Sequence, residues 1–557
     1  MFINWKSVFG LGVGTWLLLN LLQAALLQLD PDEAYYWMYA QQLDWGYFDH
    51  PPMVALLISL GSSWLPGELG VRLGSILVFA ATLYALWCLL GKPTDRRQQY
   101  HFLLLASAMP VLHVYGFVST PDSPLLLFTA LFFLTYKNFL ETDSWRNTLW
   151  LGVVMALLLY SKYHGVLVIF FSVLSNLRLL ANPKFYVASL AGAALYFPHL
   201  YWQFMHDFPT FKYHLSGRND TYEFKYTLDY LLSQLLIFSP FLLPFIFRIF
   251  RKKPNDLLER AFYFVSFGFW IFFFYSTFNG HVEPHWTAAL SIPLIVLLYR
   301  RYVEEGIESK KVMQMAGLTL IVCIILRVGL LFPIPNVKLP FTDVDWVHKL
   351  KEEVNNKPVV FINSYRDPSI YAFYTDSQVY TYTDILYRSN QYDIWNAARE
   401  IHGKEVILIG GKDWETTKAR SWKFGRKHFK LSLRENYQVT QKLKVNWEPT
   451  ETHWLAGDSI SLDVTLCNPN IHDIDFQAPR EGMEFVLQFD LPTEHLEQVP
   501  IEIDPQIETI HAGESLTLKA QFIMPEFERR DLLIGFCLKN GDLRAAYVSP
   551  KYRVQIN

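Results

Sequence analysis

The sequence has few cysteines, almost no net charge and no nucleotide-binding motif, and each absence narrows what the protein can be. Its four cysteines are too scattered for a zinc site or a disulfide framework, which leaves open only a pair between Cys467 and Cys537. A formal net charge of -3 over 557 residues gives no electrostatic reason to expect nucleic acid as a partner. No Gly-x-Gly-x-x-Gly or Walker motif stands between the hydrophobic runs, so these loops predict no nucleotide site.

Long hydrophobic runs fill the chain up to about Pro333, and charge and strand-like alternation follow. A helix needs about 20 apolar residues to cross the bilayer core. The first run is longer than a signal-peptide core and no clear cleavage site follows it, so we expect it to be retained as a span. The runs predict about eleven spans, near 8–28, 71–90, 100–118, 122–140, 147–160, 164–181, 185–204, 227–247, 261–278, 285–299 and 312–333.

Lysine and arginine are distributed unevenly over the segments between these spans. With the N-terminus inside, the cytoplasmic segments hold 17 Lys and Arg and the outward segments between spans hold five. Positive residues collect on the cytoplasmic side of membrane proteins. An odd number of spans therefore predicts an N-in, C-out topology, with the C-terminal region outside.

The first outward loop, residues 29–70, carries six acids and no Lys or Arg. Residues 33–42 are rich in Tyr and Trp, and residues 53–65 are apolar but too short to cross, so both predict interfacial helices. Outward loops avoid positive charge in any case, which explains the missing lysines. It does not explain carboxylates placed where the first span ends, because desolvating them at the membrane edge is costly. We therefore interpret Asp32 and Glu33 as functional.

Further polar side chains emerge at the same level of the predicted bundle. Asp122 opens a span, where an N-cap is the simpler interpretation, and Lys162 follows another, where snorkelling to headgroups is the simpler one. Basic groups suit a phosphate, and carboxylates suit a hydroxyl proton or a divalent ion. Together at headgroup depth they predict a lipid-phosphate substrate that undergoes group transfer. The other outward polar residues are His164, His206, Asp207, Lys212, His214, Arg218, His281, Glu283 and His285.

Four short motifs resemble the GT-C superfamily of glycosyltransferases, specifically the bacterial relatives of dolichyl-phosphate-mannose protein mannosyltransferases and the lipid A aminoarabinose transferases. The resemblance covers residues 1–330. It rests on an Asp-Glu pair just after the first span with a Pro-Pro pair under twenty residues later. The motifs are Pro31-Asp32-Glu33-Ala34-Tyr35-Tyr36, Tyr47-Phe48-Asp49-His50-Pro51-Pro52, Arg72-Leu73 and Thr120-Pro121-Asp122.

The resemblance implies a polyprenyl-phosphate sugar donor, transfer on the periplasmic or luminal side, and inversion at the anomeric carbon. It implies a catalytic role for Asp32, with Asp122 and Lys162 at the family's outward Asp and Lys. It implies a metal ligand at Asp49 and a contact to the carrier phosphate at His50. His50 departs from the family's usual lysine, and Tyr35 stands where aminoarabinose transferases carry an Arg. Their sugar specificity is therefore not transferred.

These roles predict a single-displacement transfer. Asp32 acts as general base on the acceptor hydroxyl, and Asp122 is the second catalytic carboxylate. Substrate binding is assigned to Glu33, His50, Lys162, His214 and Arg218, whose basic members stabilise the leaving phosphate.

A divalent ion held by Asp49 and His206, or His214, is left open as a cofactor. The expected partners are the lipid-linked donor, membrane lipids, and a lipid, glycan or protein acceptor. The expected location is a bacterial inner membrane with the active site and C-terminal domains on its periplasmic side.

Residues 334–557 are soluble in character. Short apolar runs at 359–362 and 406–409, with helical stretches at about 384–402, predict an α/β domain over 334–436. Period-two alternation at 460–466 and 516–522 predicts a β-sandwich over 437–557. Residues 1–333 form the predicted transmembrane transferase domain.

Three other functions remain open at this point. A transporter or flippase for a lipid-linked glycan would place ionisable groups near the bilayer midplane and show repeat halves, and this sequence shows neither. A membrane scaffold with an outer binding domain would not need the acidic pair. An oligosaccharide ligase or polymerase that uses lipid diphosphate donors is distinguished from the proposed transferase only by the Asp-Glu and Pro-Pro pattern.

Overall fold

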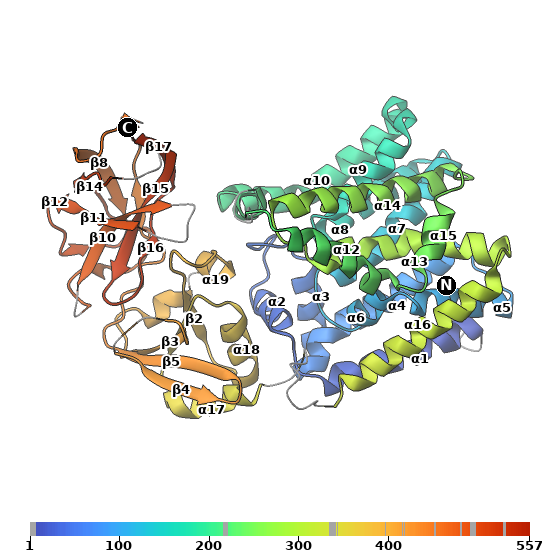
Figure 1. Cartoon of the computed structure of the whole chain (residues 1–557), viewed down its shortest axis with the longest axis horizontal. Coiled ribbons are helices and arrows are strands. Elements are labelled where there is room, and N and C mark those ends of the chain that lie inside the picture. Colours follow the sequence, from blue (N-terminus) through green and yellow to red (C-terminus); the bar gives the residue numbers. More distant parts are fainter. Residues whose placement is uncertain are drawn as a thin grey trace. The chain divides into compact units, whose positions relative to one another are not determined.

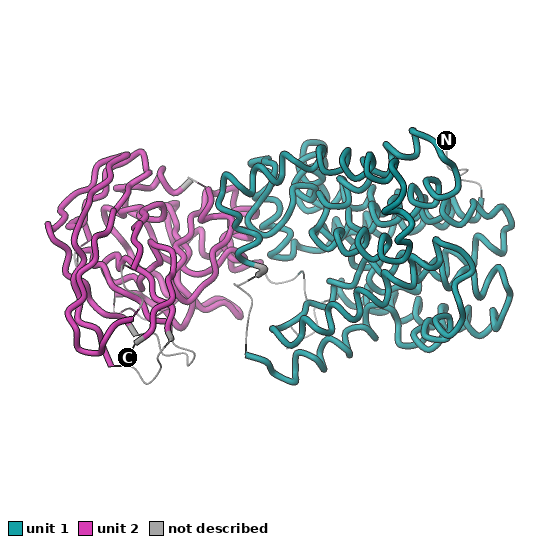
Figure 2. Tube along the Cα trace, turned by 90° about the horizontal axis from the view of Figure 1, so that it is seen from above, with its two compact units in different colours: residues 1–342 teal, residues 343–557 magenta. Residues whose placement is uncertain are grey.

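The computed structural model divides into two compact units, residues 1–342 and 343–557, coloured teal and magenta in Figure 2. The two Cys side chains that the sequence left open as a pair, Cys467 and Cys537, are both free thiols. The residues that the structure describes are 7–215, 221–332, 341, 344–395, 397–414, 416, 418–449, 453–479, 482–490, 497–526 and 531–556. The predicted boundary at residue 333 falls outside them, and the boundary at 436 stays a prediction.

Helices make up the elements of unit 1 (Figure 1). Its first half contains α1 (Val8–Leu26), α2 (Pro31–Gln41), α3 (Met53–Ser62), α4 (Gly67–Leu89), α5 (Arg96–Ser107), α6 (Pro110–Tyr115), α7 (Asp122–Glu141), α8 (Trp145–Ser161) and α9 (Gly165–Ser175). The second half contains η1 (Leu177–Ala181), α10 (Pro183–Met205), α11 (Pro209–Leu215), α12 (Phe224–Phe238), α13 (Leu243–Ile249), α14 (Leu257–Ser276), η2 (Thr277–Asn279), η3 (Pro284–Leu290), α15 (Ser291–Tyr299), η4 (Arg300–Glu304) and α16 (Ser309–Gly329).

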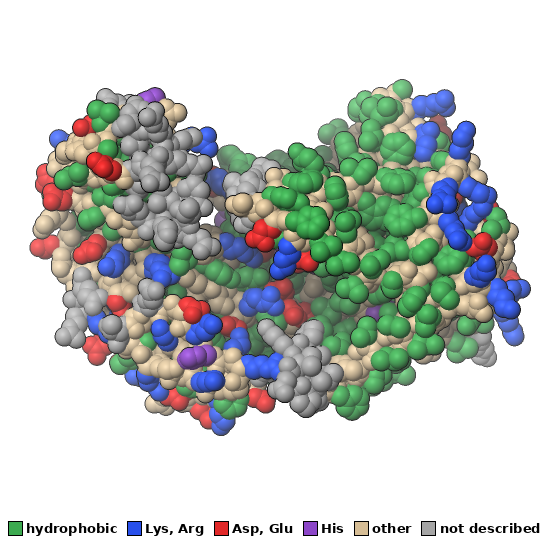
Figure 3. Space-filling view, viewed as in Figure 1, with side chains coloured by type: hydrophobic (Ala, Val, Ile, Leu, Met, Phe, Trp, Pro, Cys, Tyr) green, Lys and Arg blue, Asp and Glu red, His purple; other side chains and the backbone are tan. Residues whose placement is uncertain are grey.

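Five of the described helices are long and apolar enough to cross a membrane. They lie at Val8–Leu26, Gly67–Leu89, Asp122–Glu141, Leu257–Asn279 and Ser309–Gly329. A sixth span results if α12 and α13, bent by 93° at their break, are counted as one. On the face of unit 1 in Figure 3, hydrophobic side chains form a broad band and Lys and Arg gather at its right-hand end. The count of eleven spans and the topology stay predictions.

Glycines allow α3 and α4 to approach each other closely, which fixes the first outward loop. A Cβ atom on Gly61 would lie 2.3 Å from the carbonyl oxygen of Gly70, and one on Gly74 would lie 2.5 Å from that of Leu57. Small residues at such crossings are typical of packed membrane helices. The predicted helices of this loop are confirmed as α2 and α3, and α4 brings Arg72 against the end of α1.

Unit 2 begins with a five-stranded sheet in the order β2-β1-β3-β5-β4. β1 pairs in parallel with β2 and β3, whereas β5 is antiparallel to both of its neighbours. The predicted strands at 359–362 and 406–409 are confirmed as β1 and β3. The elements are α17 (Asp345–Val354), β1 (Val359–Ile362), α18 (Arg366–Thr375), β2 (Val379–Tyr382), α19 (Gln391–Ile394), η5 (Ala397–Ile401), β3 (Val406–Gly411), β4 (Arg420–Phe424) and β5 (Lys427–Arg434).

The predicted helical stretch over 384–402 is wrong in extent. Among the described residues of this stretch only α19 and η5 are helical, and Asn390 caps α19 and starts it at Gln391. The longer helix α18, with its buried Ile370 and Tyr371, was not predicted.

After β5, the rest of unit 2 consists of strands that form a sandwich of two sheets. One sheet has the order β11-β10-β15-β17-β7 with β16 beside β15, and the other has the order β12-β14-β8-β6. The two strands predicted from alternation, β8 and β14, pair with each other so that Leu462 lies opposite Ala520. The elements are β6 (Lys444–Asn446), β7 (His453–Trp454), β8 (Ser459–Cys467), β9 (Ile474–Asp475), β10 (Met483–Asp490), β11 (Glu497–Pro500), β12 (Glu502–Asp504), β13 (Thr509–Ile510), β14 (Ser515–Ile523), β15 (Asp531–Asn540), β16 (Ala546–Tyr547) and β17 (Tyr552–Ile556).

Candidate active site

Asp30 and Pro31 start α2 immediately after α1 and thereby place Asp32. The Asp30 carboxylate accepts a hydrogen bond from the Asp32 amide at 2.9 Å, and the Asp30 amide donates to Glu33 Oε2 at 3.1 Å. This reciprocal capping satisfies orphan amides of the first turn, and proline fits the first helical position. Asp32 is half-buried in that turn, where the helix dipole favours an ionised carboxylate.

Glu33 and Arg72 form an ion pair that is 0% exposed on both sides. Arg72 Nε and Nη2 donate to the two Glu33 carboxylate oxygens at 2.9 and 2.6 Å. The remaining N–H groups donate to the carbonyls of Ala24, Leu27 and Gln28 at 3.0, 2.6 and 2.8 Å. All five guanidinium donors are thus used, and carbonyls in the last turn of α1 and just after it are satisfied without water.

The same carboxylate also holds the loop that leads into α7. The Ser119 amide donates to Glu33 Oε1 at 2.9 Å, and the Ser119 hydroxyl donates to the Val71 carbonyl at 2.8 Å. Glu33 therefore fixes Asp32, one residue before it, relative to Asp122, three residues after Ser119. The predicted substrate contact at Glu33 has no support here, because protein donors surround its buried carboxylate.

Asp122 and Lys162 form a second buried ion pair at the start of α7. Lys162 Nζ donates to both carboxylate oxygens at 2.8 Å, and the residues are 2% and 4% exposed. Asp122 makes no N-cap hydrogen bond, and Lys162 is not a snorkelling side chain, so both simpler interpretations are wrong. His285 extends this cluster, with Nε2 3.9 Å from Asp122 Oδ2 and its own side chain 34% exposed.

Tyr115, at the end of α6, connects Asp32 with this second pair. The carboxylates of Asp122, Glu283, Asp30 and Asp32 all lie close enough to its hydroxyl to interact with it electrostatically. Its ring lies 6.3 Å from that of His285. The hydroxyl has no hydrogen-bond partner among the described residues. The structure therefore brings Asp32, Asp122 and Lys162 into one site and adds Tyr115.

Tyr115 was missed because it ends an apolar run in which an aromatic side chain is typical of core packing. His285 was recorded only as a polar residue of an outward turn. Only its position at the start of a helical stretch, after Glu283 and Pro284, distinguished it in the sequence.

Asp49 and His50 contact aromatic side chains of α2. The Tyr39 hydroxyl donates to Asp49 Oδ1 at 2.6 Å, and Tyr36 packs edge-on against His50 with ring centroids 5.4 Å apart. Burial, and then the Asp49 charge, raise the pKa of Tyr39 well above its usual value, so Tyr39 remains a donor. Asp49 also interacts electrostatically with Tyr163, the residue after Lys162.

Residues of α10 and α11 hold the tip of the first outward loop. His199 Nδ1 donates to the Trp45 carbonyl at 2.7 Å, and Trp202 Nε1 donates to Asp44 Oδ2 at 2.8 Å. The Thr210 hydroxyl donates to the Phe48 carbonyl at 2.7 Å. His206 also packs in this region. Its ring stacks on that of Trp202 with centroids 4.2 Å apart, and its Nδ1 donates to the Trp202 carbonyl at 2.9 Å.

The metal site predicted at Asp49 finds no ligand set among the described residues, and its alternative with His214 stays a prediction. Among the described residues, no three His, Cys, Asp or Glu side chains lie close enough together to hold an ion. Asp49 is engaged by Tyr39, and His206 by Trp202. Arg218 and the His214 side chain, both predicted to bind substrate, lie outside the described residues.

Comparison with known proteins agrees with the predicted resemblance. Residues 49–202 match the family model described as dolichyl-phosphate-mannose-protein mannosyltransferase. Lipid A galacturonosyltransferase RgtD of Rhizobium johnstonii is 25% identical over 193 residues, which are 33% of this chain and 40% of that relative. The crystal structure of ArnT from Cupriavidus metallidurans in the apo state has a TM-score of 0.57 at 11% identity, covering 76% of this chain and 97% of that one.

These matches confirm the resemblance to the GT-C proteins and the coarse fold. The chain is a multi-pass helical membrane protein with a β-rich C-terminal region. At 11% identity the likeness to ArnT shows the fold alone. The match to RgtD spans less than half of that relative's length.

Proposed function

We propose that this chain is a membrane glycosyltransferase that moves a sugar from a polyprenyl-phosphate donor to a cell-envelope acceptor on the outward face, with inversion. The observation that supports it most is the buried Asp122–Lys162 pair at the outer ends of predicted spans, whose carboxylate interacts electrostatically with Tyr115, as that of Asp32 does. A lysine with a fixed carboxylate partner keeps its charge despite burial, and a fixed cation suits a phosphate leaving group.

On the donor side, Lys162 stabilises the negative charge that the carrier phosphate gains as its bond to the anomeric carbon breaks. Asp122 acts through Lys162, because both of its oxygens accept from the ammonium group. It therefore positions the lysine and does not itself take a proton. His285, at the exposed edge of the cluster, donates a further hydrogen bond to the phosphate.

On the acceptor side, Asp32 takes the proton of the acceptor hydroxyl as its oxygen bonds to the anomeric carbon. The sugar–phosphate bond breaks in the same step and the polyprenyl phosphate leaves with the electron pair. If the acceptor is itself a phosphate, no base is needed and Asp32 orients it. The Tyr115 hydroxyl, which interacts electrostatically with Asp32 and Asp122, serves as a donor that holds Asp32 or a substrate oxygen in place.

Glu33 supports this site instead of contacting substrate, because the Arg72 guanidinium holds its carboxylate. His50, His214 and Arg218 remain proposed contacts of the carrier phosphate. No step is assigned to a metal ion. We place the site on the periplasmic side of a bacterial inner membrane, with a lipid, glycan or protein as acceptor.

The test is transfer of a labelled sugar from a polyprenyl-phosphate donor by the protein in membranes. Asp32→Asn should lower turnover by about 100-fold or more, since it removes the base while keeping the shape. Glu68→Gln is the matched control, because Glu68 is an acid of the same loop in the first turn of α4. Equal turnover by Asp32→Asn and wild type would sink the assigned base. Retention of the anomeric configuration in the product, read by NMR, would sink the single displacement.

A further inference from the structure

Charge is distributed very unevenly over the C-terminal region. Residues 343–557 carry 25 Lys and Arg and 32 Asp and Glu, whereas residues 418–434 within them carry seven Lys and Arg and no acid. This segment contains β4 and β5, and among the described strands β4 pairs only with β5, at the edge of its sheet (Figure 1). An acidic region therefore contains one basic hairpin, which the proposed transfer does not use.

A tight turn places two cationic side chains at the tip of this hairpin. Gly425, with a φ of +55°, is the first of the two residues between Phe424 and Lys427, which pair with each other. Glycine at this position is typical of two-residue hairpin turns. Arg426 is the second turn residue and Lys423 precedes Phe424, and both side chains are exposed. Neither side chain has an ion pair or a hydrogen bond among the described residues.

Two other cations of the hairpin are neutralised by acids of neighbouring helices. Arg420 pairs with Glu353 at 2.5 Å, and Lys427 pairs with Asp367. Lys430 Nζ donates to a backbone carbonyl at 2.6 Å. The charge that the described protein leaves uncompensated is therefore concentrated at the tip.

Two half-buried aromatic side chains lie beside the tip. Trp422 and Phe424 are on the same face of β4, because they are two residues apart in a strand, and their ring centroids lie 6.4 Å apart. Trp422 also stacks on the buried Phe429 with centroids 6.0 Å apart, which fixes its ring. Partly exposed aromatics next to Lys and Arg are typical of surfaces that contact the membrane–water interface.

Protection of the sheet edge is the simpler interpretation of these charges. Lysine on an edge strand prevents pairing with another chain. This explains Lys423, which is a strand residue. It does not explain Arg426, which lies in the turn beyond the strand, or the two aromatic side chains left partly exposed on the edge.

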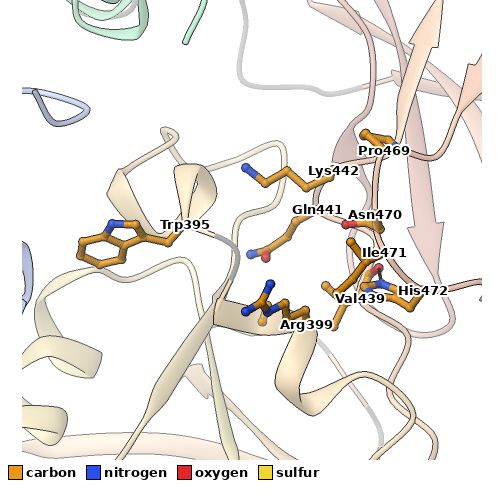
Figure 4. Close-up of a pocket in the computed structure, with 10 residues that line it drawn as sticks. Trp395, Arg399, Val439, Gln441, Lys442, Pro469, Asn470, Ile471 and His472 are labelled. Carbon is orange, nitrogen blue, oxygen red and sulfur yellow. Dashed lines mark hydrogen bonds between the residues drawn. The ribbon is translucent and has the colours of Figure 1, made fainter. Parts of the chain in front are cut away.

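The opening between α19 and the 469–472 loop does not compete as a ligand site in this unit. It holds about 50 Å³, which is room for a few water molecules and no sugar ring. In Figure 4 the Trp395 indole lies away from the other labelled side chains, and it packs edge-on against Tyr392 with centroids 5.3 Å apart. The charge of the hairpin tip instead faces solvent on a projecting turn, which suits a flat anionic surface.

We propose that the tip of the β4–β5 hairpin docks on the anionic phospholipid surface of the membrane that unit 1 spans. Lys423 and Arg426 bind lipid phosphates, and Phe424 lies at headgroup level. About 15 residues, at most about 50 Å of extended chain, connect the apolar helix α16 with α17. This tether raises the local concentration of lipid around unit 2. The acidic remainder of the unit is repelled by anionic lipid, which turns the basic hairpin toward it.

Hydrogen exchange of the full-length protein in lipid nanodiscs tests this contact. Discs of neutral phosphatidylcholine are compared with discs that contain anionic phosphatidylglycerol. We expect the amides of residues 420–428 to exchange at least about threefold more slowly in the anionic discs, because each Lys or Arg near such a surface strengthens attachment about fivefold. The difference should disappear at high salt, which screens exposed charges. The amides of β3 serve as the internal reference and should exchange equally in both discs.

The double variant Lys423→Gln with Arg426→Gln should exchange equally in the two kinds of disc, because it removes both uncompensated charges and keeps the aromatic side chains. Lys404→Gln with Lys519→Gln is the matched control. These two lysines are exposed and lie in unit 2 outside the hairpin, so the net charge changes by the same amount. The control variant should keep the protection that wild type shows.

The proposal is overturned if wild type exchanges equally in neutral and anionic discs, or if the hairpin variant stays protected. It is also overturned if polygalacturonate, a soluble acidic glycan, protects the hairpin in neutral discs as strongly as anionic lipid does, since that result assigns the hairpin to a glycan partner. None of these measurements involves sugar transfer, so the proposed function stands or falls separately.

Discussion

Among the described residues of unit 1, two ion pairs are buried, and they differ in how completely the protein satisfies them. The Arg72 guanidinium uses all five donors on Glu33 and on the end of α1. Lys162 instead holds Asp122 in a cluster that continues through half-exposed His285 to the Tyr115 ring. An ion pair whose hydrogen bonds are all made within the protein stabilises the fold. An ion pair that extends to exposed side chains is available to a ligand and to its chemistry.

Replacing Arg72 should produce the largest effect on stability. Arg72→Met leaves Glu33 as a buried charge and three helix-end carbonyls without donors. Breaking one side of a buried pair costs about 3–5 kcal/mol. We expect a large loss of thermal stability in detergent, measured by the unfolding of purified protein.

The double variant Glu33→Met with Arg72→Met separates charge from helix capping. It removes the isolated carboxylate, but the carbonyls of α1 remain unsatisfied. Recovery to wild-type stability would contradict the assignment of Arg72 as the cap of α1.

Replacing Asp122 should act mainly on turnover. Asp122→Asn removes the counter-charge of Lys162, and a buried lysine then loses its proton more readily. We expect kcat to fall about 100-fold because a neutral amine stabilises the leaving phosphate poorly. The double variant Asp122→Leu with Lys162→Met should regain stability and remain inactive. An active double variant would show that this pair is structural, like the first.

Removal of the Tyr115 hydroxyl tests whether the site extends to Asp32. Tyr115→Phe keeps the ring and removes one hydrogen-bond donor, which is worth up to about tenfold in rate. We expect kcat to fall by up to that amount, with unchanged thermal stability. Tyr84→Phe is a suitable control, since Tyr84 is a partly buried aromatic residue of α4 that packs against the helix core. A loss of stability in place of activity would assign Tyr115 to packing.

The sequence could predict the members of this site better than their pairing. Asp32 and Asp122 were identifiable from motifs and from the cost of a carboxylate at the membrane edge. The pairing of Asp122 with Lys162 was not, because these residues lie 40 positions apart and meet only through helix packing. The alternation of apolar residues predicted β8 and β14, because one face of each strand is buried. The α18 helix carries no comparable periodicity and was therefore not predicted.

Acid pH should destabilise unit 2 through His402. Because burial lowers the pKa of His402 to about 4, the unfolded chain, with an ordinary His pKa of about 6.5, binds more protons between these values. The stability contributed by His402 is therefore complete above pH about 6.5 and is lost as pH falls toward 4. Burial raises the pKa of Asp393 to about 6, which favours the folded state as pH falls and opposes this loss. The difference between wild type and His402→Gln, followed by thermal unfolding across pH 4–7, isolates the histidine.

Chelation should have the smallest effect, and it tests how complete the site is without a metal. If Lys162 and His285 stabilise the leaving phosphate, EDTA should leave turnover within about twofold of the untreated protein. The described residues around Asp49 support this expectation, because Tyr39 holds the carboxylate and no three-ligand set surrounds it. A loss of activity that Zn²⁺ or Mn²⁺ restores, and that Asp49→Asn abolishes, would instead assign part of the phosphate charge to an ion. The Asp122–Lys162 pair would then stabilise the leaving phosphate together with a metal ion. The comparison with the Glu33–Arg72 pair would have to count that ion as part of the site.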